Sequence, residues 1–459
     1  MIKAEDLVNI CRNYILLESS GIGIDKKTKY FFQKKGEEYF QNIADKMKNA
    51  EYKFVPYKEK LVLKGKNKYP RVISIPGYQD KIVLKYLSKR LIKDYYEGES
   101  LELAQKKIGE ILEKRKKYKY FIKLDLTNFY DNINHHILFN ILKTKEEISE
   151  TINFPIFPLV KKAIETPVVE ENSSDFEKNK KNIRGVHQGL AISNILAEIY
   201  LEKFDEELKK EKGLECFRYV DDILIFFNNE EVKSHYMEKA KEILEKIELK
   251  LLNEYHLELN KSKTDFGKIE NGIEYLGYKI CSNKITVKRS NVLKFEKKME
   301  KLFSEYKYIS QHNEKLKKFQ IWRINNFITG IKVKSTEDEK KVKKYGWLFY
   351  FSKIDDLLLV YHLDYLLKKF SKKYGLEHSK LKRFSRSLNE IKFNKESIYI
   401  LDVDKEYPSI DEKMKFLIEM NLYENVELKN KSDENIEKLF NGILFKTIKE
   451  LEEDKGKES

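Results

Sequence analysis

The spacing of apolar positions predicts mostly helices at the start of the chain and again in its last third. Apolar residues that recur every three or four positions indicate amphipathic helices. The residues from about 292 onward have this helical spacing, interrupted by a polar loop at 335–339, and the charged last 30 residues are weakly patterned and prone to fray. Earlier helices are expected over residues 1–50, 80–96, 101–118, 192–208 and 236–253.

Strands are expected where short apolar or β-branched runs lie between turn residues. Strands and helices alternate without a G-x-G-x-x-G or G-x-x-x-x-G-K-[ST] sequence, so neither a Rossmann nor a P-loop fold is supported. The strands are predicted at 52–76 (two strands joined by the basic turn Lys64–Lys68), 120–126, 216–227 (a hairpin), 257–259 and 273–287 (a second hairpin).

The hairpin at 216–227 has two adjacent acids at its tip, in the sequence Tyr219-Val220-Asp221-Asp222. Apolar, β-prone residues flank this tetrapeptide on both sides. A carboxylate pair at a turn contributes little to a core, but carboxylate oxygens are good ligands for a divalent cation. A third carboxylate nearby would make a site for two-metal nucleotidyl transfer.

Asp125 is the candidate for that third carboxylate, because it interrupts an apolar strand. A buried strand carboxylate is costly unless it is paired or bound to a metal. The alternative is an acid at the strand end that caps the following helix, and Asp131 fits that alternative better than Asp125 does. If the strands that carry Asp125 and Asp221 are neighbours, the two carboxylates can converge on one pair of cations.

Composition is compatible with a nucleic-acid partner. The 459 residues include 90 Lys and Arg against 75 Asp and Glu, a net charge of +15, with 29 Tyr and 27 Phe. Lysines suit phosphates and aromatic rings suit bases. An AT-rich genome would enrich lysine and tyrosine equally well, so composition alone does not decide the function.

Cysteine usage and hydropathy predict a cytoplasmic protein that is not associated with a membrane. Cys11, Cys216 and Cys281 form neither a CxxC pair nor a zinc-binding spacing, which favours free thiols in a reducing compartment. The first six residues lack the apolar run of a signal peptide. No apolar stretch approaches the roughly 20 residues of a membrane-spanning helix.

Six segments, in order, resemble the sequence motifs of the reverse transcriptases. Each is weak by itself, because a YxDD tetrapeptide or a Gln-Gly pair occurs by chance. Together they extend over about residues 50 to 285 and form a strong signal. The segments are Tyr69–Pro76 (finger strands), Asp125–Asp131 (motif A), Arg184–Ser193 (motif B), Tyr219–Asp222 (motif C), Asn260–Thr264 (motif D) and Tyr275–Tyr278 (primer-grip hairpin).

The resemblance implies an α+β fold of the right-hand polymerase type, in which fingers, a palm with an antiparallel sheet and a helical thumb are followed by a helical C-terminal extension. N-terminal helices and fingers would occupy residues 1–120. The palm would occupy 121–288, with a finger insertion at about 134–183. The thumb would span 289–375 and the extension 376–459.

The resemblance also implies an RNA-directed DNA polymerase with two Mg²⁺ ions, for which Mn²⁺ can substitute. Asp125, Asp221 and Asp222 would be the catalytic residues. With the main-chain carbonyl of Leu126, they would also be the metal ligands, Asp222 in a supporting role. One ion would lower the pKa of the primer 3′-hydroxyl, and the other would neutralise the leaving pyrophosphate.

A nucleotide-binding site follows from the same resemblance. Arg71 and two lysines of the basic turn would grip the triphosphate. Tyr130 would exclude a 2′-hydroxyl, Gln188 would hydrogen-bond the sugar or base, and Lys263 would protonate or hold the pyrophosphate. The full set is Arg71, Lys66, Lys68, Tyr130, Gln188 and Lys263.

Differences from the motifs of known reverse transcriptase subfamilies reduce the number of subfamilies that this chain can resemble. The sequence His187-Gln188-Gly189-Leu190 differs from the Gln-Gly-Gly of group II intron enzymes, and the Asn-Ala-x-x-His and Val-Thr-Gly segments of retron enzymes are missing. The last third, with Arg323–Ile331 and Tyr345–Ser352, is similar to the defence-associated "unknown group" reverse transcriptases of bacterial antiphage systems. Within that group we favour the type 3 system, which pairs two polymerases.

The partners implied are an RNA template, in particular a cognate non-coding RNA, together with a DNA primer or product and dNTPs. A second reverse transcriptase and a homo-oligomer are further candidates. Three alternatives remain open: template-independent or protein-primed DNA synthesis, a retron-type or intron-type enzyme, and a non-catalytic RNA-binding subunit that retains the fold.

Overall fold

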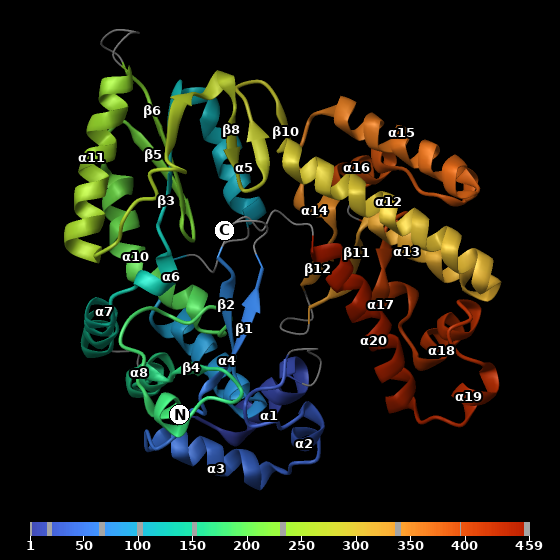
Figure 1. Cartoon of the computed structure of the whole chain (residues 1–459), viewed down its shortest axis with the longest axis horizontal. Coiled ribbons are helices and arrows are strands. Elements are labelled where there is room, and N and C mark those ends of the chain that lie inside the picture. The colour runs from blue at the N-terminus through green and yellow to red at the C-terminus, as the bar shows by residue number, and fades with distance from the viewer. Residues whose placement is uncertain are drawn as a thin grey trace. The chain divides into compact units, whose positions relative to one another are not determined.

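The computed structural model describes residues 2–15, 21–63, 69–98, 104–148, 154–229, 236–335, 341–394 and 396–453 (Figure 1). The chain forms two compact units. The first comprises Met1–Leu103 and Lys117–Gly267, and the second comprises Ala104–Lys116 and Lys268–Ser459. The candidate site residues that the structure describes all belong to the first unit.

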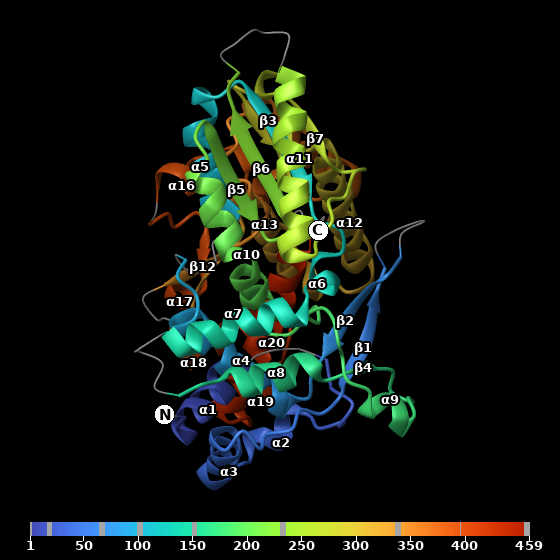
Figure 2. The same cartoon turned by 90° about the vertical axis from the view of Figure 1, so that its left-hand side faces the viewer.

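A four-stranded sheet is the centre of the first unit. Its order is β5 (Leu214–Tyr219), β6 (Asp222–Phe227), β3 (Tyr120–Asp125) and β7 (Asp265–Lys268), and β6 pairs antiparallel with both β5 and β3. Five consecutive residues of β6 are buried, which explains why its sequence is apolar without alternation. Helices α10 (Ser193–Lys210) and α11 (Tyr236–Tyr255) lie on one face of this sheet (Figures 1 and 2).

A smaller sheet contains the predicted finger strands. β1 (Tyr57–Val62) and β2 (Arg71–Ile75) form an antiparallel hairpin, and β4 (Val168–Val169) pairs parallel with β1. The basic turn with Lys66 and Lys68 lies outside the described residues. The remaining helices of this unit are α1 (Ala4–Ile10), the π-helix η1 (Cys11–Ile15), α2 (Lys29–Gln33), α3 (Glu37–Lys48), α4 (Tyr78–Asp94), α6 (Phe129–Asn132), α7 (His135–Ile148), α8 (Phe157–Glu165) and α9 (Asp175–Asn179).

A buried carboxylate joins the segment before β1 to helix α4. Asp80 is 2% exposed and accepts hydrogen bonds from the Tyr52 hydroxyl at 2.7 Å and from the Val55 N–H at 3.1 Å. Burial raises the pKa of Asp80 to about 7. This part of the unit therefore contains a group whose protonation changes near neutral pH.

The second unit combines a small meander with many helices. The meander is β8 (Ile273–Tyr275), β9 (Tyr278–Ile280) and β10 (Ile285–Val287), so the hairpin predicted at 273–287 is instead three strands. The helices are α5 (Ala104–Lys114), α12 (Arg289–His312), α13 (Lys317–Thr329), α14 (Trp347–Tyr350), α15 (Leu357–Tyr374), α16 (Phe384–Phe393), α17 (Val403–Glu406), α18 (Ile410–Glu419), α19 (Asn425–Lys429) and α20 (Asp433–Glu452), with short 3₁₀ turns at Arg115–Lys117, Ile269–Asn271, Glu314–Leu316 and His378–Lys380.

Two features of the second unit differ from the sequence prediction. The segment after 292 is not purely helical: β11 (Ile331–Lys334) pairs with β12 (Val342–Tyr345) and β13 (Leu401–Asp402). Gly330, with φ +71°, ends α13, and a Cβ there would lie 2.4 Å from the Tyr345 carbonyl oxygen. Of the last 30 residues, which were predicted to be weakly patterned, Asp433–Glu452 form the helix α20. This helix buries four apolar residues at helical spacing: Ile436, Phe440, Leu444 and Leu451.

Three further sequence predictions can be compared with the structure. The strand predicted at 257–259 is reduced to one bridge between Leu126 and Leu259. Cys11, Cys216 and Cys281 are free cysteines, as predicted. In the part of the chain that the structure describes, no helix combines the length and the apolarity needed to cross a membrane.

Candidate active site

The tight turn between β5 and β6 carries the candidate metal ligands. Tyr219 pairs with Asp222, so Val220 and Asp221 form the tip of the hairpin. On the other side of β6, Asp222 pairs with Asp125, the last residue of β3. The register therefore brings Asp125, Asp221 and Asp222 to one end of the sheet, because β3 and β6 are neighbouring strands.

Val220 has an unusual backbone conformation, with φ +59°. The left-handed region is unfavourable for a β-branched residue, and strain of this kind costs about 1–3 kcal/mol. Strained turns persist only where surrounding contacts hold them. One such contact is the Leu126 N–H, which donates to the carbonyl oxygen of Asp221 at 3.2 Å.

Three carboxyl groups lie close together at this end of the sheet. Burial raises the pKa of Asp221, and the negative charge of Asp125 adds to the rise, while Lys263 and Arg71 oppose it. Burial and the charge of Asp221 raise the pKa of Asp222 to about 7. Neighbouring buried carboxylates repel one another, so nearby cations are needed to stabilise their charged forms. Clusters of carboxyl groups with shifted pKa values are common at functional sites.

Lys263 supplies one of these cations. The Asn260 N–H donates to the carbonyl oxygen of Asp125 at 2.8 Å, and the Asn260 carbonyl accepts from the N–H groups of Lys263 and Thr264. This turn directs the Lys263 Nζ to the Asp125 carboxylate, at 2.8 and 3.0 Å from its two oxygens. The structure thus joins motifs A and D, which are 138 residues apart.

The donor set suits a hard divalent cation. Asp125, Asp221 and Asp222 offer only carboxylate oxygens, which Mg²⁺ and Mn²⁺ prefer. Among the described residues, no group of three or more His, Cys, Asp and Glu side chains has the arrangement of a metal site. The Asp125 carboxylate is instead paired with Lys263, which neutralises it.

Arg71 contributes a second cation from β2. Burial and the charge of Asp125 raise the pKa of Asp221, and the Arg71 guanidinium is near enough to oppose this rise. Its Nε is buried, and among the described residues no hydrogen-bond partner reaches it. A buried donor without a partner is costly, and a bound anionic oxygen would satisfy it. Arg71 is therefore a suitable ligand for a triphosphate.

Motif B is joined by its backbone to the finger strand. The Ser74 N–H donates to the Gln188 carbonyl oxygen at 2.8 Å. Gly189, with φ +103°, lies against β2: an added Cβ would lie 2.9 Å from Ile73 Cγ2 and 3.0 Å from the Ser74 carbonyl oxygen. Only glycine fits this close approach. The backbone of Gln188 is consequently held beside β2, the strand that carries Arg71, and Gln188 is half-buried.

Tyr130 lies between α10 and the candidate carboxylates. Its ring is half-buried, and its hydroxyl donates to Asn194 Oδ1 at 2.9 Å. Burial raises the pKa of Tyr130, and the negative charge of Asp221 adds to the effect, which places the hydroxyl within electrostatic range of the carboxylates. The Val186 N–H donates to the Tyr130 carbonyl oxygen at 2.7 Å and so links motif A to motif B.

Arg218 is a residue at this site that the sequence reasoning missed. Its side chain is 5% exposed. It donates to Asp205 and Glu198 of α10 and, at 3.0 Å, to the carbonyl oxygen of Val220. The available signals were an arginine inside an apolar strand next to the YVDD sequence and two acids seven residues apart on one helix.

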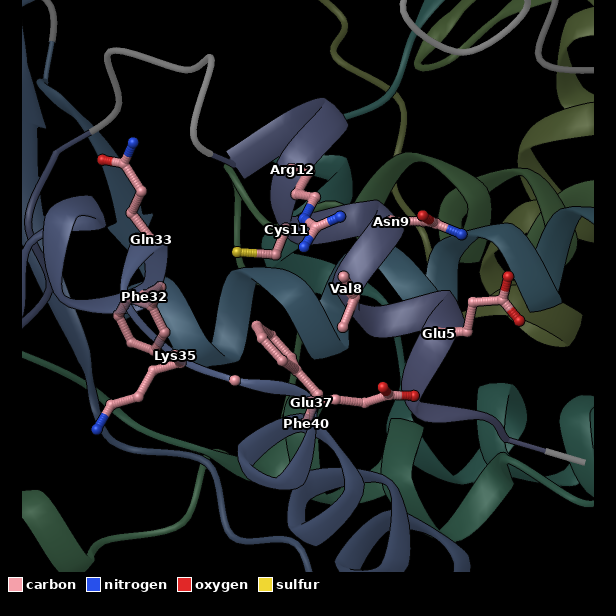
Figure 3. A pocket seen from close by; sticks show the side chains of 11 residues that line it. Glu5, Val8, Asn9, Cys11, Arg12, Phe32, Gln33, Lys35, Glu37 and Phe40 are labelled. Atoms are coloured by element: carbon pink, nitrogen blue, oxygen red, sulfur yellow. The ribbon is translucent and has the colours of Figure 1, made fainter. Parts of the chain in front are cut away.

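A cavity of about 490 Å³ lies elsewhere in the first unit, among α1, η1, α2 and α3 (Figure 3). Its lining mixes acids and bases, among them Glu5, Arg12, Lys35 and Glu37. Burial raises the pKa of the Cys11 thiol to about 11, so this lining cysteine is protonated at neutral pH. No lining residue belongs to the strands of the carboxylates, and the cavity is not part of the candidate site.

An antiparallel sheet that gathers three carboxylates, a lysine and an arginine at one end has the features of a nucleic-acid polymerase palm. Residues 58–280 match the family described as "Reverse transcriptase (RNA-dependent DNA polymerase)". This part of the chain is therefore a reverse transcriptase domain with an α+β fold, and its enzyme class is that of the RNA-directed DNA polymerases, which are nucleotidyltransferases.

Solved structures similar to this chain include telomerases of two Candida species. Apo telomerase from Candida tropicalis truncated from its C-terminal domain is 18% identical over 51% of this chain and 55% of its own, with a TM-score of 0.38. Telomerase from Candida albicans in complex with a fragment of telomeric RNA is 15% identical over 92% of this chain and 67% of its own, with a TM-score of 0.41.

A third structure, apo telomerase from Candida tropicalis, is 15% identical over 84% of this chain and 68% of its own, with a TM-score of 0.39. The chain thus spans about half to two thirds of the length of these telomerases. All three TM-scores are below 0.5, so the assignment rests on the family match. A search of curated proteins found no match.

Proposed function

We propose that this protein synthesises DNA on an RNA template by two-metal nucleotidyl transfer, with Asp125 and Asp221 as the principal metal ligands. The observation that carries the proposal is the register of β3 and β6, which pairs Asp125 with Asp222 and leaves Asp221 at the adjacent turn. The raised pKa of Asp221, due to burial and to Asp125, is the expected consequence of ligands gathered for a cation.

The residues divide the chemistry among them. Two Mg²⁺ ions, or Mn²⁺ in their place, held by Asp125, Asp221 and the Leu126 carbonyl would activate the primer 3′-hydroxyl and neutralise the pyrophosphate. Asp222 supports Asp221. Lys263 would hold the pyrophosphate or give it a proton, and its bond to Asp125 at 2.8 Å supports this role.

The nucleotide would be held by Arg71, Tyr130 and Gln188. The Nε of Arg71, which no group among the described residues reaches, suits a triphosphate oxygen, and Lys66 and Lys68 of the basic sequence before β2 would add positive charge. The ring of Tyr130 would exclude a 2′-hydroxyl and so select dNTPs. The Gln188 amide would bond the sugar or base of the incoming nucleotide.

The template–primer duplex would contact the second unit. Lys294, Lys297 and Lys301 are exposed and recur every three or four residues on α12, which forms one basic face. Such a face suits a phosphate backbone. In this proposal residues 1–120 with the insertion at 134–183 act as fingers, the remainder of 121–288 as palm, 289–375 as thumb and 376–459 as an extension.

Within the cell, we place the enzyme in the cytoplasm of a bacterium, in an antiphage system of the "unknown group". A cognate non-coding RNA would be the template, and a second polymerase or a homo-oligomer would complete the type 3 system. The departures of the motif B sequence and the character of the last third support this branch over the retron and intron enzymes.

Primer extension tests the central proposal. The wild-type protein with Mg²⁺ and an RNA template annealed to a DNA primer should incorporate dNTPs. Asp221→Asn should lower the rate by about 10³-fold or more. Its Tm should be unchanged or higher, because the substitution removes a buried negative charge next to Asp125. Asp175→Asn, which changes an exposed acid on α9, is the matched control and should behave as the wild type.

Removal of the template separates the main proposal from template-independent or protein-primed synthesis. RNase treatment before addition of dNTPs should stop incorporation if RNA is copied. Continued synthesis, or a product covalently attached to the protein, would favour the alternative. Absence of incorporation on every template–primer supplied would contradict the proposed activity and favour a non-catalytic subunit.

A further inference from the structure

The turn that carries Asp221 cannot be explained by its own sequence. Val220, in the left-handed region at φ +59°, is followed by Asp221, and neither residue is a glycine or an asparagine. A β-branched residue leaves that region unless other parts of the fold hold it. The direction in which the Asp221 side chain points depends on this backbone, because the two residues share a peptide bond.

Arg218 makes a second contact with the turn, in addition to the bond from the Leu126 N–H to the Asp221 carbonyl oxygen. Its Nη1 donates to the carbonyl oxygen of Val220 at 3.0 Å, so the guanidinium binds the peptide group between Val220 and Asp221. Arg218 belongs to β5, and Val220 lies two residues later in the turn. The bond therefore links the end of β5 directly to the turn that follows it. The side chain is 5% exposed, which leaves little water to compete for this carbonyl.

Two carboxylates of α10 orient the guanidinium. Its Nε donates to both carboxylate oxygens of Asp205, at 2.8 and 2.9 Å, and its Nη2 donates to Glu198 Oε2 at 2.7 Å. Burial by itself would lower the pKa of Arg218, but Asp205 and Glu198 outweigh it and the net pKa is raised. The Arg218 guanidinium is therefore charged, and its hydrogen bonds fix the orientation of its plane.

We propose that Arg218 is a positioning residue for nucleotidyl transfer. Fixed by Asp205 and Glu198, its guanidinium holds the Val220 carbonyl, keeps the turn in its left-handed conformation and so keeps Asp221 beside Asp125. The inference rests on the proposed function, because it assigns the purpose of the turn to metal binding by Asp221.

Arg218→Lys is the direct test, since a lysine keeps the charge but cannot bond two carboxylates and a carbonyl in one plane. Compared with the wild type, kcat should fall by about tenfold or more, with the KM for dNTP changed by less than about threefold. Mn²⁺ affinity, measured by titration with an electron-spin-resonance readout, should weaken by about tenfold.

Arg90→Lys is the matched control. Arg90 lies in the same unit and bonds a carboxylate, Asp94, and a backbone carbonyl, that of Phe154, but it has no contact with the turn. It should lose Tm to a similar degree and keep kcat and Mn²⁺ affinity. Hydrogen exchange in metal-free protein should be faster at residues 219–226 in Arg218→Lys and unchanged there in Arg90→Lys.

Val220→Gly tests the mechanism of positioning. Glycine adopts a positive φ without strain, so the turn should depend less on Arg218. The loss of Mn²⁺ affinity caused by Arg218→Lys should therefore be smaller in a Val220→Gly background than in the wild type. An equal or larger loss in that background, or a change in Tm alone, would overturn the proposal.

A milder variant keeps the proposal testable if Arg218→Lys folds poorly. Glu198→Gln leaves the three bonds from Arg218 to Asp205 in place and should shift the same readouts in the same direction by a smaller factor. Unchanged exchange at 219–226 with unchanged Mn²⁺ affinity would overturn the role of Arg218. If the wild type binds Mn²⁺ but incorporates no dNTP, the proposed function fails while these two readouts still test Arg218.

Discussion

At the scale of single residues, Phe129 and Tyr130 are adjacent aromatic residues with different surroundings. Phe129 is 2% exposed and belongs to the core, whereas Tyr130 is half-buried and reaches Asn194 with its hydroxyl. Burial and the negative charge of Asp221 raise the pKa of Tyr130. A ring that is only half-buried and in electrostatic range of Asp221 can contact a bound nucleotide.

Tyr130→Val should therefore relax the selection of the sugar. Loss of the ring would remove the steric barrier to a 2′-hydroxyl, and rNTP incorporation relative to dNTP should rise by about tenfold or more, a discrimination of about 1.4 kcal/mol. Single-nucleotide extension with dATP and rATP measures the ratio. Tyr130→Phe, which keeps the ring but loses the bond to Asn194, is the control and should retain the selection. An unchanged ratio in Tyr130→Val would exclude the barrier.

At the scale of elements, the contact between motif B and β2 depends on glycine. Gly189 and Gly213 both have positive φ, +103° and +82°, but only Gly189 has neighbours within 4 Å of an added Cβ. An alanine at either position is strained by about 1–2 kcal/mol, and at Gly189 it would also push β2 away. The strand that would move carries Arg71.

Gly189→Ala should thus raise the KM for dNTP by about tenfold, because displacement of β2 moves the proposed triphosphate ligand. Gly213→Ala, which adds strain without a clash, is the matched control and should lower Tm slightly while KM is retained. Steady-state kinetics and thermal unfolding of both variants give the comparison. Equal kinetic effects in the two variants would show that strain alone is responsible.

The buried Asp80, which joins the segment before β1 to α4, should make stability depend on pH. Burial raises the pKa of Asp80 to about 7, with Asp25 adding to the rise and the Tyr52 and Val55 hydrogen bonds and Lys27 opposing it. The folded state then binds more protons than the unfolded state between about pH 4 and 7, so the contribution of Asp80 is present at low pH and is lost as pH rises through about 7.

Asp80→Asn should remove this dependence. The free energy of unfolding of the variant relative to the wild type should rise by roughly 4 kcal/mol between pH 4 and pH 7.5. Urea titrations at several pH values measure the free energy of unfolding of both proteins. Because the wild type and Asp80→Asn share their other titrating groups, such as His187, the contributions of these groups cancel in the difference. A constant offset between the two curves would mean that Asp80 is ionised throughout.

At the scale of the whole molecule, the charge balance predicts binding to nucleic acid that weakens with salt. The net charge is +15, and α12 carries an exposed row of lysines in the second unit. Each phosphate contact adds about 0.9 to the slope of log K against log salt concentration. The basic face of α12 should account for part of that slope.

Lys297→Gln with Lys301→Gln should reduce the slope by roughly 1 to 2 and weaken binding on all sequences alike. Lys415→Gln with Lys438→Gln, which remove the same charge from α18 and α20, should leave the slope near that of the wild type. Fluorescence anisotropy with a labelled RNA–DNA duplex at several salt concentrations gives the slopes. Equal reductions in both pairs would mean that net charge, not α12, governs binding.

Much of the fold was predictable because its signals are local. The apolar spacing of 192–208 became α10, the apolar run after Asp222 became β6, and the paired acids marked their hairpin. Where local spacing is ambiguous the prediction was wrong. A short strand needs a neighbour, and β11 pairs with β12 and with the distant Leu401–Asp402 of β13. A charged helix needs a surface to cover, and α20 packs against α18 and β12.

The sequence by itself determined the chemistry of the candidate site, because Asp125, Asp221, Tyr130 and Gln188 lie in short motifs whose order is readable from one chain. Only the tertiary structure decided which groups meet: Lys263 bonds Asp125 across 138 residues, and Arg218 joins two acids of α10 to a strained turn. Such contacts depend on strands and helices that lie far apart in the sequence, and the local pattern around each residue does not show which of them will pack together.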